Sequence, residues 1–236
     1  MTQTLKLRFN EIVKDRFSAL YNLKPIEIED DLKYIKKEKD GATMEHVYEA
    51  YSCDKIKKIR LAQLNAEGAV YVRNGVIVPE DIYDLPIFSY DIVESVRRTF
   101  AILDITPWRK TVEYRKKYME PMKPVFESWQ NIPIIKEAKQ ELSEWGREFE
   151  SGYKLYLRCE KQYEPEIEVA FNKYLDLYIS YLKDAKPITD PAVKKEIDDY
   201  KKHYQKVYQE NDPGKGPVTV FFGHDWAERF FKDFPF

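Results

Sequence analysis

The most unusual residue of this chain is Asp104, which lies in the apolar run TFAILDITPW (99–108). Its neighbours Ile102, Leu103 and Ile105 predict a buried β-strand, where an unpaired charged carboxylate is costly. Such a group either finds hydrogen-bond partners or keeps its proton near neutral pH. A carboxyl that keeps its proton can deliver it to a substrate. Asp104 is therefore either a proton donor or an aspartate near a strand end, held by hydrogen bonds to the following turn.

Three further polar residues interrupt or end predicted elements. Asn74 stands in VYVRNGVIVP, Asp212 follows a predicted helix in QENDPGKGP, and Arg158 ends the apolar strand YKLYLRC (153–159). Asn-Gly is a common hairpin turn and Asn-Asp-Pro-Gly an ordinary turn sequence, so the first two residues have a structural explanation as well as a functional one. Arg158 can bind a ligand carboxylate through two parallel hydrogen bonds, or it can form a structural salt bridge.

Residues that bind metals or nucleotides are scarce. The histidines, His46, His203 and His224, are scattered without metal-ligand spacing. The 8 glycines form neither a dinucleotide fingerprint nor a P-loop, and the 2 cysteines are too few for a disulfide framework. An enzyme built on this chain would therefore use carboxylates as acid–base groups and take its electrons from another molecule.

The composition is that of a globular protein with no strong charge preference. The 236 residues are 43% hydrophobic and 34% charged, with a formal net charge of −2, so we expect no nucleic-acid or membrane partner. No apolar run approaches the roughly 20 residues of a membrane span, and no signal or transit peptide is evident. We therefore expect a cytoplasmic protein, or a mature one in the plastid stroma. Aromatic residues reach 15% and either line a pocket for a flat ligand or fill the core.

The pattern of the chain predicts an α/β fold in a single domain over residues 1–236. An amphipathic helix opens the chain over 5–23, and short β-rich segments follow between residues 44 and 107. Strands joined so closely must pair antiparallel. Helices are predicted mainly after Pro107, over 108–129, 131–145, 164–185, 190–211 and 223–234. We expect a three-layer α/β/α sandwich with a central antiparallel sheet.

Five segments resemble, in the same order, those of ferredoxin-dependent bilin reductases. PEDIYDLPIFSYDIV (79–93) resembles the family signature Pro-x-x-x-x-Asp-Leu-Pro-x-Phe-Gly-x-Asp-Leu/Ile-Val, and FAILDITP (100–107) resembles the Ala-Ile-x-Asp-Leu-x-Pro strand. EWGREFESGYKLYLRC (144–159) is similar to a Trp-Gly-x-x-Phe segment that leads into an Arg-terminated strand. NDPGKG (211–216) and FGHDWAERFFKDFPF (222–236) resemble the C-terminal loop and helix of the family.

The resemblance implies an enzyme that holds a linear tetrapyrrole between its sheet and its C-terminal helices. It also implies that no metal or flavin is bound, that ferredoxin supplies single electrons and that protein groups supply protons. Asp104 matches the central catalytic aspartate of the family pattern, and Asp212 matches the second aspartate. Arg158 matches an arginine that holds a propionate, with Lys215 as a basic residue near it. Phe88 of the signature is expected to contact the substrate.

Departures from the pattern narrow the expected reaction. Asn74 stands where members that make phycocyanobilin have a histidine, and Arg60 and Ala62 replace their His-x-Glu pair. Asn74 resembles instead the phycoerythrobilin and phytochromobilin synthases, so we count it with the aspartates as a catalytic residue. The implied reaction is ferredoxin-dependent reduction of biliverdin IXα to phycoerythrobilin, its 15,16-dihydrobiliverdin intermediate, or phytochromobilin. The alternatives are reduction of another open-chain tetrapyrrole, such as a chlorophyll catabolite, and bilin binding without catalysis.

Two basic segments are candidates for a docking surface, because ferredoxins are usually acidic. The first consists of Lys55, Lys57, Lys58 and Arg60. The second consists of Arg109, Lys110, Arg115, Lys116 and Lys117, which would equally suit a solvated helix face. We expect the protein to act as a monomer.

Overall fold

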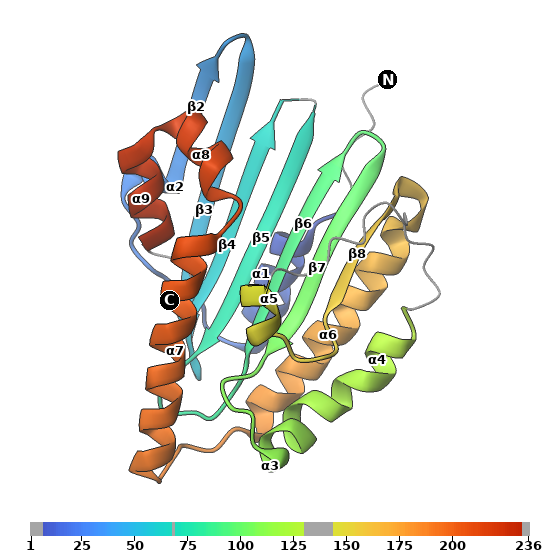
Figure 1. The fold of residues 1–236 in the computed structure, drawn as a ribbon, viewed down its shortest axis with the longest axis vertical. Coiled ribbons are helices and arrows are strands. Elements are labelled where there is room, and N and C mark those ends of the chain that lie inside the picture. The colour runs from blue at the N-terminus through green and yellow to red at the C-terminus, as the bar shows by residue number, and fades with distance from the viewer. Residues whose placement is uncertain (1–6, 68, 130–143, 233–236) are drawn as a thin grey trace.

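One antiparallel sheet forms the centre of the fold (Figure 1). The structure is a computed structural model that describes residues 7–67, 69–129 and 144–232. The strands lie in the order β1-β3-β4-β5-β6-β7-β8, and β2 also pairs with β3. Their bounds are Lys24–Pro25 (β1), Tyr34–Lys39 (β2), Ala42–Cys53 (β3), Ile56–Ala66 (β4), Val70–Pro79 (β5), Ile87–Ser95 (β6), Arg98–Thr106 (β7) and Leu155–Glu160 (β8). The short connections between successive strands leave only antiparallel pairing, as predicted.

Helices cover both faces of the sheet (Figure 1). On one face, which we call the α6 face, lie α1 (Phe9–Leu20) and α6 (Glu164–Asp184). On the other, the α7 face, lie α5 (Glu144–Glu148), α7 (Pro191–Asn211), α8 (Lys215–Phe222) and α9 (His224–Lys232). Shorter helical segments are α2 (Asp30–Lys33), α3 (Val112–Tyr114), η1 (Arg115–Met119), η2 (Glu120–Met122), α4 (Lys123–Glu127) and η4 (Lys161–Tyr163). The predicted sandwich is confirmed.

Two further points concern the helix predicted over 131–145 and the length of the described helices. The helix expected over 131–145 lies outside the described residues except for its last two positions. None of the described helices is long and apolar enough to cross a membrane.

Strand β6 shows how alternation divides side chains between the two faces. Phe88, Tyr90 and Ile92 are buried in the α6-face core, which also contains the aromatic residues of α6. Ser89 and Asp91 therefore point to the α7 face, where they remain partly exposed. The α6 face thus holds the main apolar core, and Ser89 and Asp91 are turned to the α7 face.

Asn74 and Gly75 lie inside β5, so the alternative explanation of Asn-Gly as a hairpin turn does not apply. Gly75 is directly opposite Tyr90, and a Cβ atom at position 75 would lie 2.2 Å from Cζ of the Tyr90 ring. Glycine is therefore present to let the ring cross the strand, not to form a turn. The Tyr90 hydroxyl continues to Asn10 of α1 and donates to its Oδ1 at 2.6 Å.

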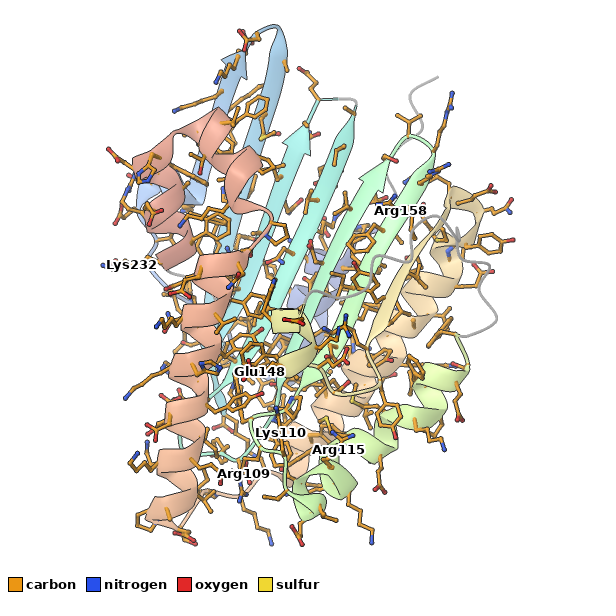
Figure 2. The ribbon with its side chains drawn as sticks, viewed as in Figure 1. Arg109, Lys110, Arg115, Glu148, Arg158 and Lys232 are labelled. Carbon is orange, nitrogen blue, oxygen red and sulfur yellow. The ribbon has the colours of Figure 1, made fainter. Side chains whose placement is uncertain are left out.

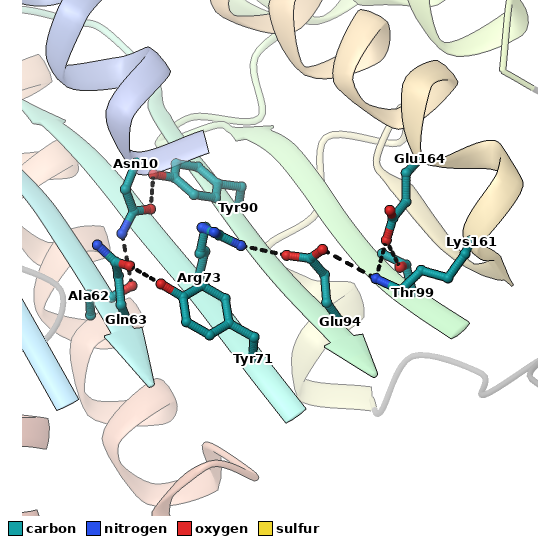
Figure 3. Close-up of polar contacts among 10 residues, drawn as sticks. All are labelled: Asn10, Ala62, Gln63, Tyr71, Arg73, Tyr90, Glu94, Thr99, Lys161 and Glu164. Carbon is teal, nitrogen blue, oxygen red and sulfur yellow. Dashed lines mark hydrogen bonds and ion pairs between the residues drawn. The ribbon is translucent and has the colours of Figure 1, made fainter. Parts of the chain in front are cut away.

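A chain of paired charges crosses the α6 face at the end of β6 (Figure 3). Arg73 forms an ion pair with Glu94, whose side chain is 0% exposed. The other oxygen of Glu94 pairs with Lys161 Nζ at 3.2 Å, and Lys161 also pairs with Glu164 of α6 at 2.5 Å. These charges link strands β5 and β6 to the start of α6, and their pairing indicates a structural role.

Candidate active site

Neighbouring strands place polar side chains side by side on the α7 face. Asn74 of β5 lies directly opposite Asp91 of β6, and Ser89 of β6 lies opposite Asp104 of β7. Side chains opposite each other in an antiparallel pair have Cβ atoms about 5 Å apart, and diagonal neighbours are about 7–8 Å apart. Asp91 and Asp104 are therefore close diagonal neighbours that point to the same layer.

Arg60 adds a positive charge to this group from β4. It is 1% exposed, and its Nη1 donates to Oδ1 of Asn74 at 2.8 Å. The guanidinium carbon lies 5.0 Å from the ring centroid of Tyr48 and 4.6 Å from that of Phe230. Because a guanidinium does not lose its proton in proteins, Arg60 is a permanent buried cation.

Asp91 is the one carboxyl of the group with an unsatisfied oxygen. Its Oδ1 is shut off from solvent and has no hydrogen-bond partner within the described part of the chain. Burial and, after it, the charge of Asp212 raise the pKa of Asp91 to about 7, against the opposing charge of Arg60. Asp91 therefore holds its proton up to neutral pH, with one oxygen available to a ligand.

Asp212 approaches the group from the helical layer, at the C-terminal end of α7. Its Oδ1 accepts a hydrogen bond from the backbone nitrogen of Gly214 at 2.8 Å. Burial raises the pKa of Asp212, while that hydrogen bond and the charge of Arg60 lower it. Asp91 on the sheet and Asp212 on the helices thus lie close enough for the charge of Asp212 to act on Asp91.

Tyr208, one turn before the end of α7, shows that the three carboxyls converge. Burial raises the pKa of Tyr208 to about 12, and the charges of Asp212, Asp104 and Asp91 contribute to the rise. The ring of Tyr208 packs against that of Tyr204 with centroids 4.4 Å apart. On the side of α7, the site is therefore lined by the rings of Tyr204 and Tyr208, and the Tyr208 hydroxyl lies within the electrostatic reach of the three carboxyls.

Asp104 is 1% exposed, but both of its oxygens are already engaged. Oδ1 accepts from the backbone nitrogen of Ile105 at 2.9 Å and from the Ser151 hydroxyl at 2.5 Å, and Oδ2 accepts from the Ser151 nitrogen at 3.2 Å. Burial raises the pKa of Asp104, and attraction to Lys154 together with these hydrogen bonds opposes the rise. Asp104 therefore ties the segment after α5 to the sheet. Its hydrogen-bond partners are Ile105, the next residue of β7, and Ser151, which is distant in the sequence.

The two basic residues expected to hold a propionate lie far apart. Arg158 lies on β8 opposite Phe100, is partly exposed on the α7 face, and forms no salt bridge with any described residue (Figure 2). Lys215 begins α8, which packs near β2 at the other edge of the sheet, and its Nζ pairs with Glu228 of α9 at 2.7 Å. The structure therefore leaves Arg158 available for a carboxylate and does not bring Lys215 to it.

Phe88, which was expected to contact the substrate, does not belong to this group on the α7 face. Its side chain is fully buried on the α6 face, where it packs against Tyr90, Phe171 and Tyr178. Its neighbour Ser89 is the residue that faces the site, because successive residues of a strand point to opposite faces.

Sequence reasoning missed Asp91 and placed Arg60 in a candidate docking surface rather than in the site. Asp91 carries the same signal as Asp104, since it stands between the apolar residues Tyr90 and Ile92 of a strand. Arg60 likewise follows Ile59 and precedes Leu61 in a strand that is buried on both faces. A polar residue flanked by apolar ones in a central strand is therefore the signal that locates Arg60, Asp91 and Asp104.

Comparisons with known proteins identify the family of this chain. The profile of the ferredoxin-dependent bilin reductases matches residues 10–236, and the chain belongs to this family. It is therefore a ferredoxin-dependent oxidoreductase that acts on a bilin, as the resemblance implied.

Individual relatives come from cyanobacteria and plants. A 15,16-dihydrobiliverdin:ferredoxin oxidoreductase of Gloeobacter violaceus is 27% identical over 97% of this chain and 93% of the relative. A phycoerythrobilin:ferredoxin oxidoreductase of the same organism is 31% identical over 79% of this chain and 76% of the relative. The crystal structure of tomato phytochromobilin synthase in complex with biliverdin has the same fold, with a TM-score of 0.84 and 16% identity over 96% of this chain and 82% of that one.

Proposed function

We propose that this protein reduces biliverdin IXα or 15,16-dihydrobiliverdin to a phycobilin of the phycoerythrobilin or phytochromobilin type. The names of its relatives support the substrate class, and the tomato relative was crystallised with biliverdin. The observation that carries the proposal is the pair of carboxyls, Asp91 on the sheet and Asp212 on the helices, beside the buried cation Arg60. A flat tetrapyrrole between these two layers would meet a proton donor on each side.

Each double bond reduced takes up two electrons and two protons. Two reduced ferredoxins supply the electrons one at a time, because an iron–sulfur cluster carries single electrons. The protonated Asp91 gives a proton to the reduced bilin through its unsatisfied Oδ1, and Asp212 supplies a second proton. The charge of Arg60, positioned by Asn74, stabilises the negative charge that the bilin acquires with each electron. Arg158 binds a propionate on the open side of the sheet.

The proposal gives the role of direct donor to Asp91 in place of Asp104. Asp104 already accepts hydrogen bonds at both oxygens, so donating a proton would require it to release the Ser151 segment. Asp91 has an oxygen that faces no protein partner among the described residues. Asp104 is then a positioning residue that fixes the loop behind the site.

Asp104→Asn is expected to affect stability more than chemistry. An asparagine amide presents a donor to the Ser151 backbone N–H, which loses its acceptor at a buried position. This should lower the free energy of unfolding by about 1–3 kcal/mol, while kcat stays within about tenfold of the wild type because no transferred proton is removed. Denaturant unfolding and anaerobic turnover of the same preparation check both values. A loss of turnover by two orders of magnitude without loss of stability would restore Asp104 as the donor.

The proposed function itself is tested by anaerobic turnover with reduced ferredoxin. Biliverdin and 15,16-dihydrobiliverdin are supplied separately, and the products are identified by chromatography against standards. We expect one of the named phycobilins or the dihydro intermediate. Turnover of a chlorophyll catabolite with no reaction of either bilin would favour the alternative tetrapyrrole substrate. Spectral shifts on mixing with biliverdin that do not change after ferredoxin is added would favour bilin binding without catalysis.

A further inference from the structure

A group of exposed basic residues lies beyond the end of β7, where the chain leaves the sheet (Figure 2). We define the basic surface by Lys110, Arg115, Lys116 and Lys117 with Lys183 and Lys186, which follow α6 or end it. Lys117, Lys183 and Lys186 line a cavity of about 600 Å³ with Asp84 and Asp184. The fold therefore brings Lys117 together with Lys183 and Lys186 from a distant part of the sequence, although the whole chain has a net charge of −2.

The charges of this surface are largely unneutralised. Lys110, Lys116 and Lys117 form no salt bridge with any residue in the described part of the chain. The adjacent Arg109 differs, because it pairs with Asp84 and with Glu196, each at 3.0 Å. A surface whose basic side chains are not neutralised by salt bridges attracts an acidic partner and repels a basic one.

Val112 adds an exposed apolar side chain to the same surface. It lies between Lys110 and Arg115 in the sequence, and 74% of its area is exposed. Protein interfaces commonly combine an apolar contact with a charged rim, and the rim charges mainly steer association. Val112 and its basic neighbours have this composition.

The other basic segment of the sequence does not form a surface of this kind. Lys58 is 7% exposed and Arg60 is 1% exposed, and Arg60 belongs to the site on the α7 face. Lys55 donates to the backbone oxygen of Leu182 at 2.8 Å, and Lys57 pairs with Asp81 at 2.9 Å. This segment is therefore excluded as a continuous docking surface.

The basic surface also connects to the site through packed protein. Arg115 Nη2 donates to the backbone oxygen of Ser151 at 3.5 Å, and Ser151 in turn donates to Asp104. Trp108, just before Lys110, is fully buried, and its ring lies 5.7 Å from that of Tyr204 on α7. Packed side chains, rather than solvent, therefore lie between a partner bound at this surface and the carboxyls of the site.

We propose that reduced ferredoxin docks on this basic surface, with acidic side chains against Lys110, Lys116 and Lys117 and an apolar contact at Val112. The proposal deepens the proposed function, on whose electron donor it rests. It places electron entry at the end of β7, on a different part of the molecule from the partly exposed Arg158, which remains available for the bilin.

The test compares two double charge reversals of equal size. K116E/K117E alters the basic surface, and the control K24E/K36E alters exposed lysines of β1 and β2 at the other edge of the sheet. Each is assayed for KM for ferredoxin at several salt concentrations, and for turnover with dithionite in place of ferredoxin. We expect K116E/K117E to raise the KM roughly tenfold or more and to flatten its salt dependence. The control should stay near the wild type, and turnover with dithionite should not change in either variant.

Binding is measured separately, by calorimetric titration with oxidised ferredoxin, so that the result does not depend on which bilin is reduced. A roughly tenfold weaker Kd for K116E/K117E than for K24E/K36E supports the docking surface even if no bilin turns over. Equal Kd values for both variants and the wild type would overturn it. So would an equal loss of turnover with dithionite and with ferredoxin, which would place the defect in the site rather than in docking.

Discussion

Asp91→Asn is expected to lower kcat for bilin reduction by about two to four orders of magnitude, the range that a single proton donor contributes. Asparagine matches a protonated aspartic acid in size and is uncharged, so the bilin should still bind, but the amide has no acidic proton to give. Anaerobic single-turnover absorbance gives the rate, and titration with biliverdin gives the Kd. The Kd should stay close to that of the wild type.

The matched comparison is Asp104→Asn, the same change at the diagonal neighbour on β7. If Asp91 is the donor, the two variants should differ by at least an order of magnitude in kcat, with Asp91→Asn the slower. If instead both variants are equally slow, Asp91 and Asp104 would be needed equally, which would contradict the assignment of Asp91 as the single direct donor. Wild-type turnover by Asp91→Asn would remove its role altogether.

The largest expected effect on stability comes from the charges on the α6 face. Glu94→Ala leaves Arg73 and Lys161 without their shared partner, and Arg73 is buried with it. Removing one member of a buried ion pair costs about 3–5 kcal/mol, because the remaining charge is desolvated and uncompensated. Denaturant unfolding should therefore show a drop of this size in the free energy of unfolding. The turnover of each folded molecule should change little, because the network lies on the face opposite the site.

Glu127→Ala is the control for this effect. Glu127 pairs with Lys123 on the solvent-exposed side of α4 at 3.7 Å, and such surface pairs contribute only about 0.3–0.5 kcal/mol. Equal losses in the two variants would mean that the paired charges on the α6 face contribute no more than a surface pair.

The antiparallel sheet and its covering helices were predictable because they depend on local signals. Short connections between strands restrict the pairing, and alternation of apolar and polar residues marks strands. Local signals left the position of Asn74 and Gly75 open, since the surrounding segment is typical of a strand. Their dipeptide favours a turn, but the ring of Tyr90 on the next strand needs the space that glycine leaves. A contact between strands therefore overrode a local preference.

The site was predictable only in part, for a similar reason. Asp91 and Asp104 look alike in the sequence, since each interrupts an apolar strand. What distinguishes them is Ser151, which is 47 residues from Asp104 in the chain and occupies its oxygens. For Phe88, alternation shows that neighbouring residues of a strand face opposite ways, but not which of the two faces holds the ligand. Arg60 looked like part of a surface cluster because Phe230, whose ring lies beside its guanidinium, belongs to a helix at the far end of the chain.

The pH dependence of single-turnover bilin reduction tests the central claim most directly, with wild type and Asp91→Asn measured side by side. Because the pKa of Asp91 is raised to about 7, the wild type has its donor protonated below that pH. Its rate should fall about tenfold for each pH unit above it. The slow rate of Asp91→Asn should lack this decline. The same decline near pH 7 in both proteins would contradict the assignment of Asp91 as the proton donor.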